Sequence, residues 1–296
     1  MSESEPQPQP FPNIADMLRR KGIWLEKRKS QHFLKHQRVC MEIAALGAAT
    51  RDDLVIEVGA GLGNLTVELA AHAGRVVSVE LDRAFEDWHQ YLTASYPGLE
   101  FLYDDFLKVD VEALVAEKRG GGRVLGVGNL PYQITSDILF RFVDSPLTFD
   151  RLVFMVQREV AERIAAGASK RESGALTYKI ALRYKAHIAM SVKAEEFLPP
   201  PKVDSAVLVL DPLPRALFDS PAHRKQVYLL LDRIFNYRRK TLVNCLMLGQ
   251  LVQHREAANS ALDQAAISRE RRPETLSLEE VLALAAALRD QDTAHA

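Results

Sequence analysis

The stretch Leu54-Val-Ile-Glu-Val-Gly-Ala-Gly-Leu-Gly63 decides the fold of this chain. Its first half, Leu54–Val58, is a short β-branched run typical of a buried parallel strand. Gly59, Gly61 and Gly63 then predict a sharp turn into a helix, because glycine adopts backbone conformations that other residues avoid and lets a ligand approach the main chain. Glycines in such a turn often serve only packing, so the pattern alone is a weak sign of a ligand site.

The spacing of these glycines bears on which ligand the turn holds. A dinucleotide pyrophosphate site typically has the pattern G-x-G-x-x-G, whereas Asn64-Leu65 follows Gly63 here. The cofactor need not contain a pyrophosphate, which favours S-adenosylmethionine over NAD. Glu80 ends the next predicted strand, where an acidic side chain can accept hydrogen bonds from both ribose hydroxyls.

Short apolar runs and helical patterns alternate on both sides of this turn. We expect strands at 54–58, 76–80, 99–103, 124–127 and 152–156, and helices at 39–46, 65–73, 83–95, 137–143 and 159–166. The runs 188–192 and 206–210 are expected to complete the sheet as a late hairpin. This alternation indicates a doubly wound α/β fold, here a Rossmann-like sheet of the S-adenosylmethionine-dependent methyltransferase kind.

The character of the chain changes at both ends. Residues 1–12 are rich in Pro and Gln, which predicts a disordered tail. After Pro212 only helical spacing is found, with helices expected at 226–235, 241–248, 255–261 and 278–288. We therefore expect a cofactor-binding catalytic domain at 13–213 and a small all-helical domain at 214–296.

Two acidic residues follow the strand expected at 99–103. Asp105 stands where a carboxylate could receive the amine of the cofactor's adenine, and the adjacent Asp104 is an alternative for this role.

The tetrapeptide Asn129-Leu130-Pro131-Tyr132 follows the run 124–128 and predicts chemistry on a planar exocyclic amine. The lone pair of adenine N6 is delocalised into the ring, so an enzyme helps by accepting hydrogen bonds from both N–H groups. The Asn129 side chain and the Leu130 carbonyl can supply these acceptors. Pro131 restrains the loop, and Tyr132 offers a face for an extruded base. Positioning and electrostatic support would carry most of the catalysis, without a metal or a strong base.

The composition of the chain bears on its cellular compartment and on the kind of partner that it binds. Cys40 and Cys245 are the only cysteines, which offers neither a disulfide framework nor a metal cluster and favours a reduced, cytoplasmic setting. No membrane span or signal peptide is evident. Segments 19–38, 151–193 and 224–240 are basic, whereas 51–112 is acidic. This distribution predicts a surface that follows nucleic-acid phosphates away from the cofactor.

With these motifs in place, the chain resembles the KsgA family of small-subunit rRNA adenine N6,N6-dimethyltransferases over most of its length. The resemblance is carried by the stretches 29–34 (KSQHFL), 57–66, 79–82 (VELD), 128–136, 155–161 (MVQREVA), 197–207 (FLPPPKVDSAV) and 235–242 (FNYRRKTL).

The resemblance implies a set of site residues and a substrate. The cofactor site would take His32, Leu34, Gly59, Gly61, Glu80, Asp105 and Asn129, and Phe197 would close over the target base opposite Tyr132. The substrate would be two adjacent adenosines in the hairpin loop near the 3′ end of 16S rRNA, each methylated twice, in the assembling small ribosomal subunit.

Two basic clusters match a role in binding this RNA. Lys27-Arg28-Lys29 precedes the cofactor-closing segment, and Arg238-Arg239-Lys240 is expected on a helix of the C-terminal domain. Both can contact phosphates without reading sequence.

Some positions depart from the family's pattern. Asp104 replaces the usual Gly, Ser173 a Tyr and Ala181 a Gln, while His32 often corresponds to Asn. The first change bears on the adenine pocket, and the next two on packing or rRNA contacts.

Several alternatives remain open at this point. The same chemistry could be directed at 23S rRNA, as in the macrolide-resistance methyltransferases, or the chain could be a non-catalytic RNA-binding assembly factor. A DNA adenine methyltransferase is disfavoured by Leu130, since those enzymes usually carry a second Pro there. A nicotinamide oxidoreductase lacks its pyrophosphate fingerprint. We expect a monomer.

Overall fold

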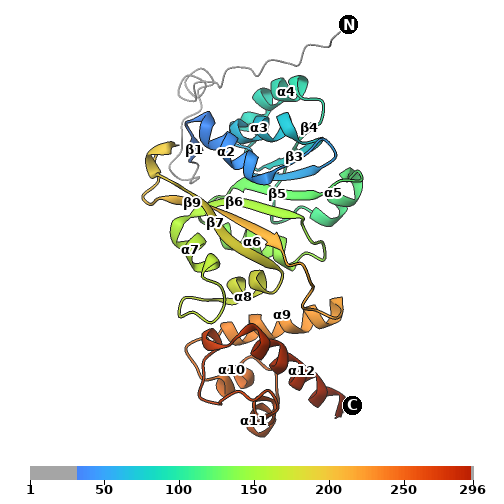
Figure 1. Cartoon of the computed structure of the whole chain (residues 1–296), viewed down its shortest axis with the longest axis vertical. Helices are drawn as coiled ribbons and strands as arrows, with labels where there is room; N and C mark the ends of the chain where they lie inside the picture. The colour runs from blue at the N-terminus through green and yellow to red at the C-terminus, as the bar shows by residue number, and fades with distance from the viewer. Residues whose placement is uncertain (1–31, 295–296) are drawn as a thin grey trace. The chain divides into compact units, whose positions relative to one another are not determined.

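The central sheet positions every motif discussed above. The computed structural model describes residues 32–294. Seven strands lie in the order β4-β3-β2-β5-β6-β9-β7, and the pairs from β4 through β6 are parallel (Figure 1). The strands are β2 Leu54–Val58, β3 Arg75–Glu80, β4 Leu99–Tyr103, β5 Val124–Asn129, β6 Arg151–Gln157, β7 Tyr184–Val192 and β9 Ser205–Pro212. The Rossmann-like sheet and the adjacency of the two late strands are as the sequence predicts.

Helices cover both faces of the sheet. All five residues of β2 are buried, which is the pattern of a strand packed on both sides. α3 packs on β3, α4 on β4, and α2 on β6. The helices in this part are α2 Gln37–Gly47, α3 Asn64–His72, α4 Glu86–Ser95, α5 Val111–Lys118, α6 Thr135–Asp144, α7 Arg158–Ala165 and α8 Ala175–Ala181, with the 3₁₀ turn η2 at Arg83–Phe85 before α4.

A two-stranded ribbon lies outside the main sheet. β1, Phe33–Leu34, pairs antiparallel with β8, Phe197–Leu198, so that Leu34 stands opposite Phe197. A second 3₁₀ turn, η3 at Ala194–Glu196, leads into β8. The Lys35 N–H donates to the Glu196 carbonyl at 2.9 Å and extends the pairing. This ribbon joins segments more than 160 residues apart, a pairing that no local pattern in the sequence predicts.

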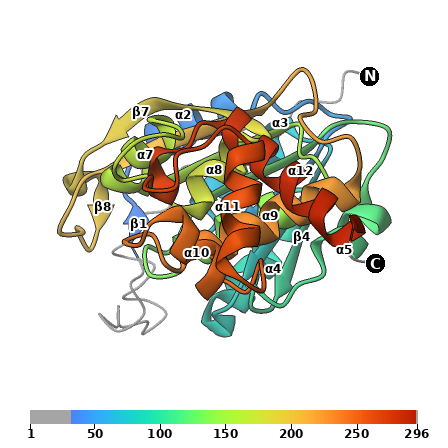
Figure 2. The same ribbon diagram turned by 90° about the horizontal axis from the view of Figure 1, so that it is seen from below.

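After Pro212 the described chain is helical. The elements are α9 Pro221–Phe235, α10 Leu242–Leu248, α11 Arg255–Gln264, η4 Pro273–Thr275 and α12 Leu278–Ala294. α10 packs on α9 and α11, and α12 packs on α9 and α11, which gathers the orange and red helices together (Figure 2). Their apolar faces make a core that includes Leu231, Ile234, Leu246 and Leu284.

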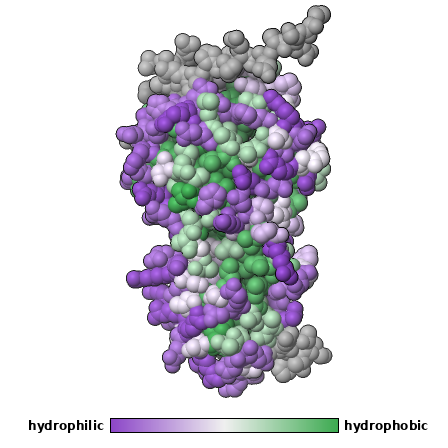
Figure 3. Space-filling model, in the orientation of Figure 1, coloured by the Kyte–Doolittle hydropathy of each residue, from purple (hydrophilic) through white to green (hydrophobic). Residues whose placement is uncertain are grey.

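The described chain divides into two compact units. The first comprises 32–135, 151–157 and 190–207, and the second comprises 136–150, 158–189 and 208–294. The second unit therefore contains the C-terminal helices together with two earlier segments. The surface of the C-terminal helices carries green hydrophobic patches bordered by purple hydrophilic residues (Figure 3).

One expectation about the basic clusters is wrong. Arg238, Arg239 and Lys240 do not lie on a helix but in the turn between α9 and α10. α9 ends at Phe235, and the Tyr237 and Lys240 N–H groups then make turn hydrogen bonds to the carbonyls three residues earlier. Cations gather favourably just beyond a helix C-terminus, where the helix dipole presents its negative end. The tail expected at 1–12 lies outside the described residues.

Two helices were not predicted from the sequence. α5 and α8 are eight and seven residues long, and the apolar residues of α5 show little helical periodicity, whereas the equally short α7 and α10 were predicted. α5 begins at a side-chain cap, since the Ala113 N–H donates to the Asp110 carboxylate at 2.9 Å. Within the described residues, no helix combines the length and the apolar character that crossing a membrane requires.

Candidate active site

The glycine turn after β2 has the backbone geometry that only glycine adopts readily. Gly59, Gly61 and Gly63 have φ angles of +79°, +54° and +79°. The Gly59 N–H donates to the Val79 carbonyl at 2.8 Å, which ties the turn to β3. The turn lies at the carboxyl edge of the parallel strands, where α/β folds bind nucleotides, and Gly59 and Gly61 are half-buried there.

Glu80 connects the turn to the end of β3. Its carboxylate accepts the Gly61 N–H and the Asp82 N–H, both at 2.8 Å. The side chain is buried, and burial raises the pKa of its carboxyl above the ordinary value. A carboxylate has about four acceptor positions, so two protein donors leave capacity for ligand hydroxyls.

Buried acceptor atoms lie beside the same turn. Glu57 is fully buried in β2 and accepts a hydrogen bond from the Ser78 hydroxyl at 2.6 Å. Burial raises the pKa of Glu57 to about 7, against the lowering effect of the Ser78 hydrogen bond. Glu57 Oε1 and Asn64 Oδ1 are among the buried side-chain atoms that form no hydrogen bond within the described residues, as is the hydroxyl of Thr66 beside Glu57. Buried acceptors of this kind suit a ligand that brings its own donors, such as the ammonium group of S-adenosylmethionine.

The segment around His32 is tied across the sheet to the predicted tetrapeptide. Asn129 Nδ2 donates to the His32 carbonyl at 2.9 Å, and Asn64 Nδ2 donates to the Leu34 carbonyl at 3.1 Å. The His32 ring nitrogen Nδ1 lies 2.7 Å from the Pro199 carbonyl. The structure thus brings together three cofactor-site residues predicted from the sequence, His32, Leu34 and Asn129.

The tetrapeptide itself forms a braced loop at the end of β5. The Leu130 N–H donates to the Met155 carbonyl at 3.0 Å, and the Leu130 side chain is buried. The Pro131 carbonyl accepts hydrogen bonds from the Thr135 hydroxyl and the Ile134 N–H. The loop is therefore held by main-chain contacts before any substrate arrives, which favours precise positioning of a reacting group.

Aromatic rings surround His32. Its ring stacks against Tyr132 with centroids 5.6 Å apart and meets Phe197 edge-on at 6.5 Å. The Tyr132 hydroxyl lies 2.5 Å from the Ser205 hydroxyl, and burial raises the tyrosine pKa. Phe197 is buried. The resemblance implies that Tyr132 and Phe197 lie on either side of the target base, and the structure places His32 in contact with both rings.

Asp105 lies at the same edge of the sheet but is held locally. In the pairing of β3 with β4, Glu80 stands opposite Tyr103, two residues before Asp105. The Asp105 carboxylate accepts the Leu107 N–H at 3.1 Å, and Asp104 accepts the Asp105 N–H at 2.7 Å. Asp105 is more buried than the exposed Asp104, which favours Asp105 as the residue that faces a pocket.

Sequence reasoning missed two residues that contact the turn from α4. His89 Nε2 lies 2.9 Å from the Gly61 carbonyl, and Trp88 Nε1 donates to the Leu62 carbonyl at 2.9 Å. No local motif marks either residue, because the contacts form only once α4 packs on β4.

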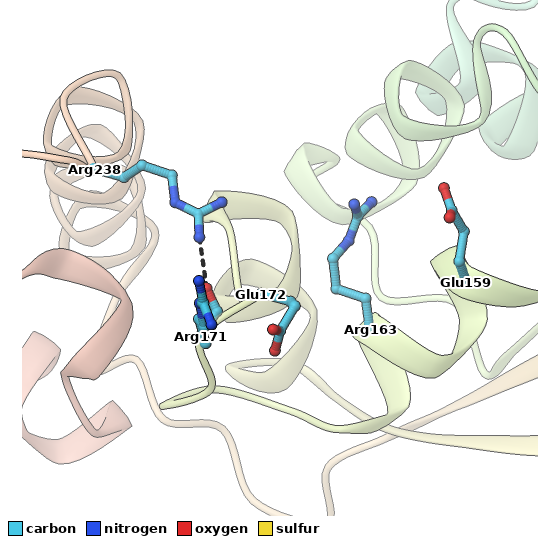
Figure 4. A pocket seen from close by; sticks show the side chains of 5 residues that line it. All are labelled: Glu159, Arg163, Arg171, Glu172 and Arg238. Atoms are coloured by element: carbon cyan, nitrogen blue, oxygen red, sulfur yellow. Dashed lines mark hydrogen bonds between the residues drawn. The ribbon is translucent and has the colours of Figure 1, made fainter.

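A basic pocket lies in the second unit, near the turn that follows α9. It has a volume of about 360 Å³ and is lined by Glu159, Arg163, Arg171, Glu172 and Arg238 (Figure 4). Arg238 donates to the Arg171 carbonyl at 2.5 Å, which fixes its guanidinium against the main chain at Arg171. Arg163 and Arg171 come from the basic segment 151–193, and that charge pattern was the only sequence signal for them.

Of the other basic residues that were predicted to bind RNA, two are exposed and three lie outside the residues that the structure describes. Arg239 and Lys240 are exposed beside Arg238. Lys27, Arg28 and Lys29 lie outside the described residues. In the part of the chain that the structure covers, no group of three or more His, Cys, Asp or Glu side chains could hold a metal ion.

Comparison with known proteins gives consistent matches over most of the chain. Residues 25–284 match the family model described as ribosomal RNA adenine dimethylase. The protein named ribosomal RNA small subunit methyltransferase A of Geobacter metallireducens is 38% identical over 274 residues, covering 92% of this chain and 98% of its own. The protein of the same name from Alkaliphilus metalliredigens is 36% identical over 260 residues, covering 87% and 90%.

Solved structures agree with the fold. A dimethyladenosine transferase from Plasmodium falciparum superposes with a TM-score of 0.72 at 25% identity, covering 88% of this chain and 98% of its own. The 23S rRNA methyltransferase ErmE superposes with a TM-score of 0.63, also at 25% identity, covering 87% and 99%.

Proposed function

Because this chain belongs to the ribosomal RNA adenine dimethylase family, we propose that it methylates N6 of two adjacent adenosines in the 3′-terminal hairpin loop of 16S rRNA. The methyl donor is S-adenosylmethionine, and the product is N6,N6-dimethyladenosine. The observation that carries the proposal at the level of the site is the fixed orientation of Asn129, whose side-chain nitrogen is held by the His32 carbonyl.

That orientation matters for the chemistry. With Nδ2 donating to His32, the opposite end of the amide is its oxygen, the atom needed to accept an N–H of the target amine. The Leu130 carbonyl would provide the second acceptor. Two acceptors would direct the amine lone pair out of conjugation and toward the methyl donor, so catalysis would rest on positioning. The Tyr132 ring would stack on the extruded base, with Phe197 on the opposite side.

The residues around the glycine turn suit S-adenosylmethionine. This cofactor supplies an electrophilic methyl group on a sulfonium. The half-buried main chain at Gly59 and Gly61 would lie against it, Glu80 would accept the ribose hydroxyls, and Asp105 would accept the adenine amine. The unpartnered oxygens of Glu57 and Asn64 fit its ammonium end.

The small-subunit target is supported by the relatives. Those of 34–38% identity carry the small-subunit name, whereas the similarity to the 23S enzyme is structural, at 25% identity. A non-catalytic assembly factor would not need Asn129 held in this orientation.

RNA would be held chiefly through phosphates. The pocket of Arg163, Arg171 and Arg238, with exposed Arg239 and Lys240 beside it, would take backbone phosphates despite Glu159 and Glu172. Lys27, Arg28 and Lys29 would add contacts near the cofactor. The enzyme would act as a monomer on the assembling small subunit, in the cytoplasm where that particle forms.

The decisive experiment uses labelled S-adenosylmethionine with purified small and large ribosomal subunits that lack adenine dimethylation, followed by nucleoside mass spectrometry. We expect dimethyladenosine in small-subunit rRNA alone, and its loss with Asn129→Ala. Removing an electrostatic group of this kind typically lowers kcat by about 100-fold or more. Label only in large-subunit rRNA would assign the chain to 23S rRNA. Tight cofactor binding with no label in either subunit would refute an rRNA methyltransferase activity.

A further inference from the structure

α4 contacts three successive residues of the glycine turn. His89 Nε2 lies 2.9 Å from the Gly61 carbonyl oxygen, and Trp88 Nε1 donates to the Leu62 carbonyl. Leu92 completes the contact, since its Cδ1 lies 2.5 Å from the position that a Cβ on Gly63 would occupy. One face of this helix therefore follows the turn residue by residue.

The partners of His89 determine which ring nitrogen carries the proton. A carbonyl oxygen can only accept, so Nε2 must donate to Gly61. The other nitrogen, Nδ1, lies 2.9 Å from the Tyr103 hydroxyl, which keeps its proton because burial raises the tyrosine pKa to about 12. Nδ1 of a neutral ring then accepts from that hydroxyl. Tyr103 on β4 thus selects the tautomer that bonds to the turn.

His89 is kept neutral by its surroundings. The side chain is 1% exposed, and Phe101 stacks on the ring with centroids 3.9 Å apart. Burial lowers the pKa of His89 to about 4, against the opposing influence of the Gly61 carbonyl and Glu86. Arg83 lies over the ring of Tyr103 at 5.2 Å, beyond the hydrogen-bonded pair.

Gly61 is consequently held from both sides. Its N–H donates to the Glu80 carboxylate at 2.8 Å, and its C=O accepts from His89. The two peptide planes that meet at Gly61 are therefore each fixed by a buried side chain. Without these contacts the backbone of a glycine, here at a φ angle of +54°, could adopt many other conformations.

We infer that His89 is a positioning residue for the cofactor, acting through Gly61 to keep the glycine turn in the shape that binds S-adenosylmethionine. The inference rests on the cofactor assigned under the proposed function. A purely apolar side chain would fill this space without the cost of burying a ring with two polar atoms. The polar contacts of His89 instead restrict the turn before the ligand binds, so that binding costs less conformational entropy.

The test measures binding of S-adenosylhomocysteine to the full chain by calorimetry, together with the kinetics of methyl transfer. His89→Leu removes the donor and keeps an apolar side chain, so the dissociation constant should rise about five- to tenfold, the loss expected for one hydrogen bond. The kcat at saturating cofactor should change less than about twofold. His89→Gln, whose amide can donate to Gly61, should restore most of the affinity.

Two further variants separate this role from general stability. Tyr103→Phe removes the hydroxyl that selects the tautomer and should weaken binding about two- to threefold. Val115→Ala, a core truncation in α5, should lower the melting temperature and leave the affinity unchanged. If His89→Leu fails to fold, Tyr103→Phe and His89→Gln still decide the question.

Each outcome has a distinct meaning. Wild-type affinity in His89→Leu, or in Tyr103→Phe where the former cannot be purified, would overturn the positioning role. Folded His89→Gln that binds as weakly as His89→Leu would overturn it as well. A wild-type chain that does not bind S-adenosylhomocysteine would instead contradict the cofactor assignment itself.

Discussion

The hydroxyl and the ring of Tyr132 have separate roles. Its hydroxyl is committed to Ser205, while its ring is the surface proposed for the target base. Tyr132→Phe should keep kcat/KM for rRNA within about threefold, because the ring remains. Tyr132→Ala should lower it by about 10- to 100-fold, since base–aromatic stacking contributes roughly 1–3 kcal/mol. Single-turnover methylation of the undermethylated small subunit measures both, and equal losses in the two variants would contradict stacking.

Glu57 links the site to pH, also at the scale of one residue. Its pKa is about 7 in the folded chain against an ordinary value of 4.5. Between these values the unfolded chain releases the proton and the folded chain retains it. The stabilising contribution is therefore fully present below pH 4.5 and is lost as the pH rises through 7, by about 3 kcal/mol.

Glu57→Gln should remove this pH dependence. Chemical unfolding of the ligand-free chain at several values from pH 4.5 to 8 should show the variant gaining stability relative to the wild type as the pH rises. His89, with its lowered pKa, acts in the opposite direction between pH 4 and 6.5 and is present in both proteins, so the difference isolates Glu57. Glu117→Gln, at an exposed position on α5, is the control. A constant difference across the range would contradict the raised pKa of Glu57.

At the scale of elements, the turn between β2 and α3 depends on contacts from another helix. Gly63→Ala would place a side chain in the left-handed region and against Leu92 of α4. The backbone strain alone costs roughly 1–2 kcal/mol. We expect a drop of about 2 kcal/mol in the free energy of unfolding, together with weaker cofactor binding.

The control for this substitution is Gly121→Ala, where an added Cβ would meet no atom within 4 Å. Urea unfolding and calorimetric titration with S-adenosylhomocysteine compare the two variants. Equal stability and affinity in both would mean that α4 yields freely and does not shape the turn.

At the scale of the whole molecule, the basic residues proposed to bind RNA and the residues proposed to bind the cofactor and the target base belong to different parts of the chain. The basic pocket lies in the second compact unit, and the cofactor and tetrapeptide residues lie in the first. Arg163→Ala and Arg238→Ala should each raise KM for the ribosomal substrate and reduce the slope of log affinity against log salt by about 1. The kcat at saturating substrate should remain close to that of the wild type.

Arg269→Ala supplies the matched control, because its guanidinium is already paired with Asp263 at 2.6 Å. Methylation kinetics from low to moderate salt test all three variants. An unchanged salt slope in the pocket variants would exclude phosphate contacts there.

Local patterns in the sequence were sufficient for the sheet and the turn. The run at 54–63 predicted β2, the three glycines and the start of α3 to within one residue, because strand propensity, glycine conformation and burial all act over short distances. The helices α5 and α8 were not predicted, whereas the equally short α7 and α10 were; α5 differs from α7 in that its apolar residues do not recur at helical spacing. Residues 238–240, expected on a helix, lie in a turn; the helix expected at 226–235 does end at Phe235, so these residues fall between it and α10.

The sequence by itself determined the parallel α/β sheet, the glycine turn, the Asn129 tetrapeptide and the resemblance to the rRNA dimethylases, all of which depend on residues adjacent in the chain. Only the tertiary structure decided that His32 and Asn129 share a hydrogen bond, that β1 pairs with β8, that His89 bonds to Gly61, and that Arg163, Arg171 and Arg238 share a pocket. The first three of these contacts join residues 28 to 165 positions apart, and Arg171 and Arg238 in the pocket are 67 positions apart. Their formation depends on how whole elements pack, which no local pattern encodes.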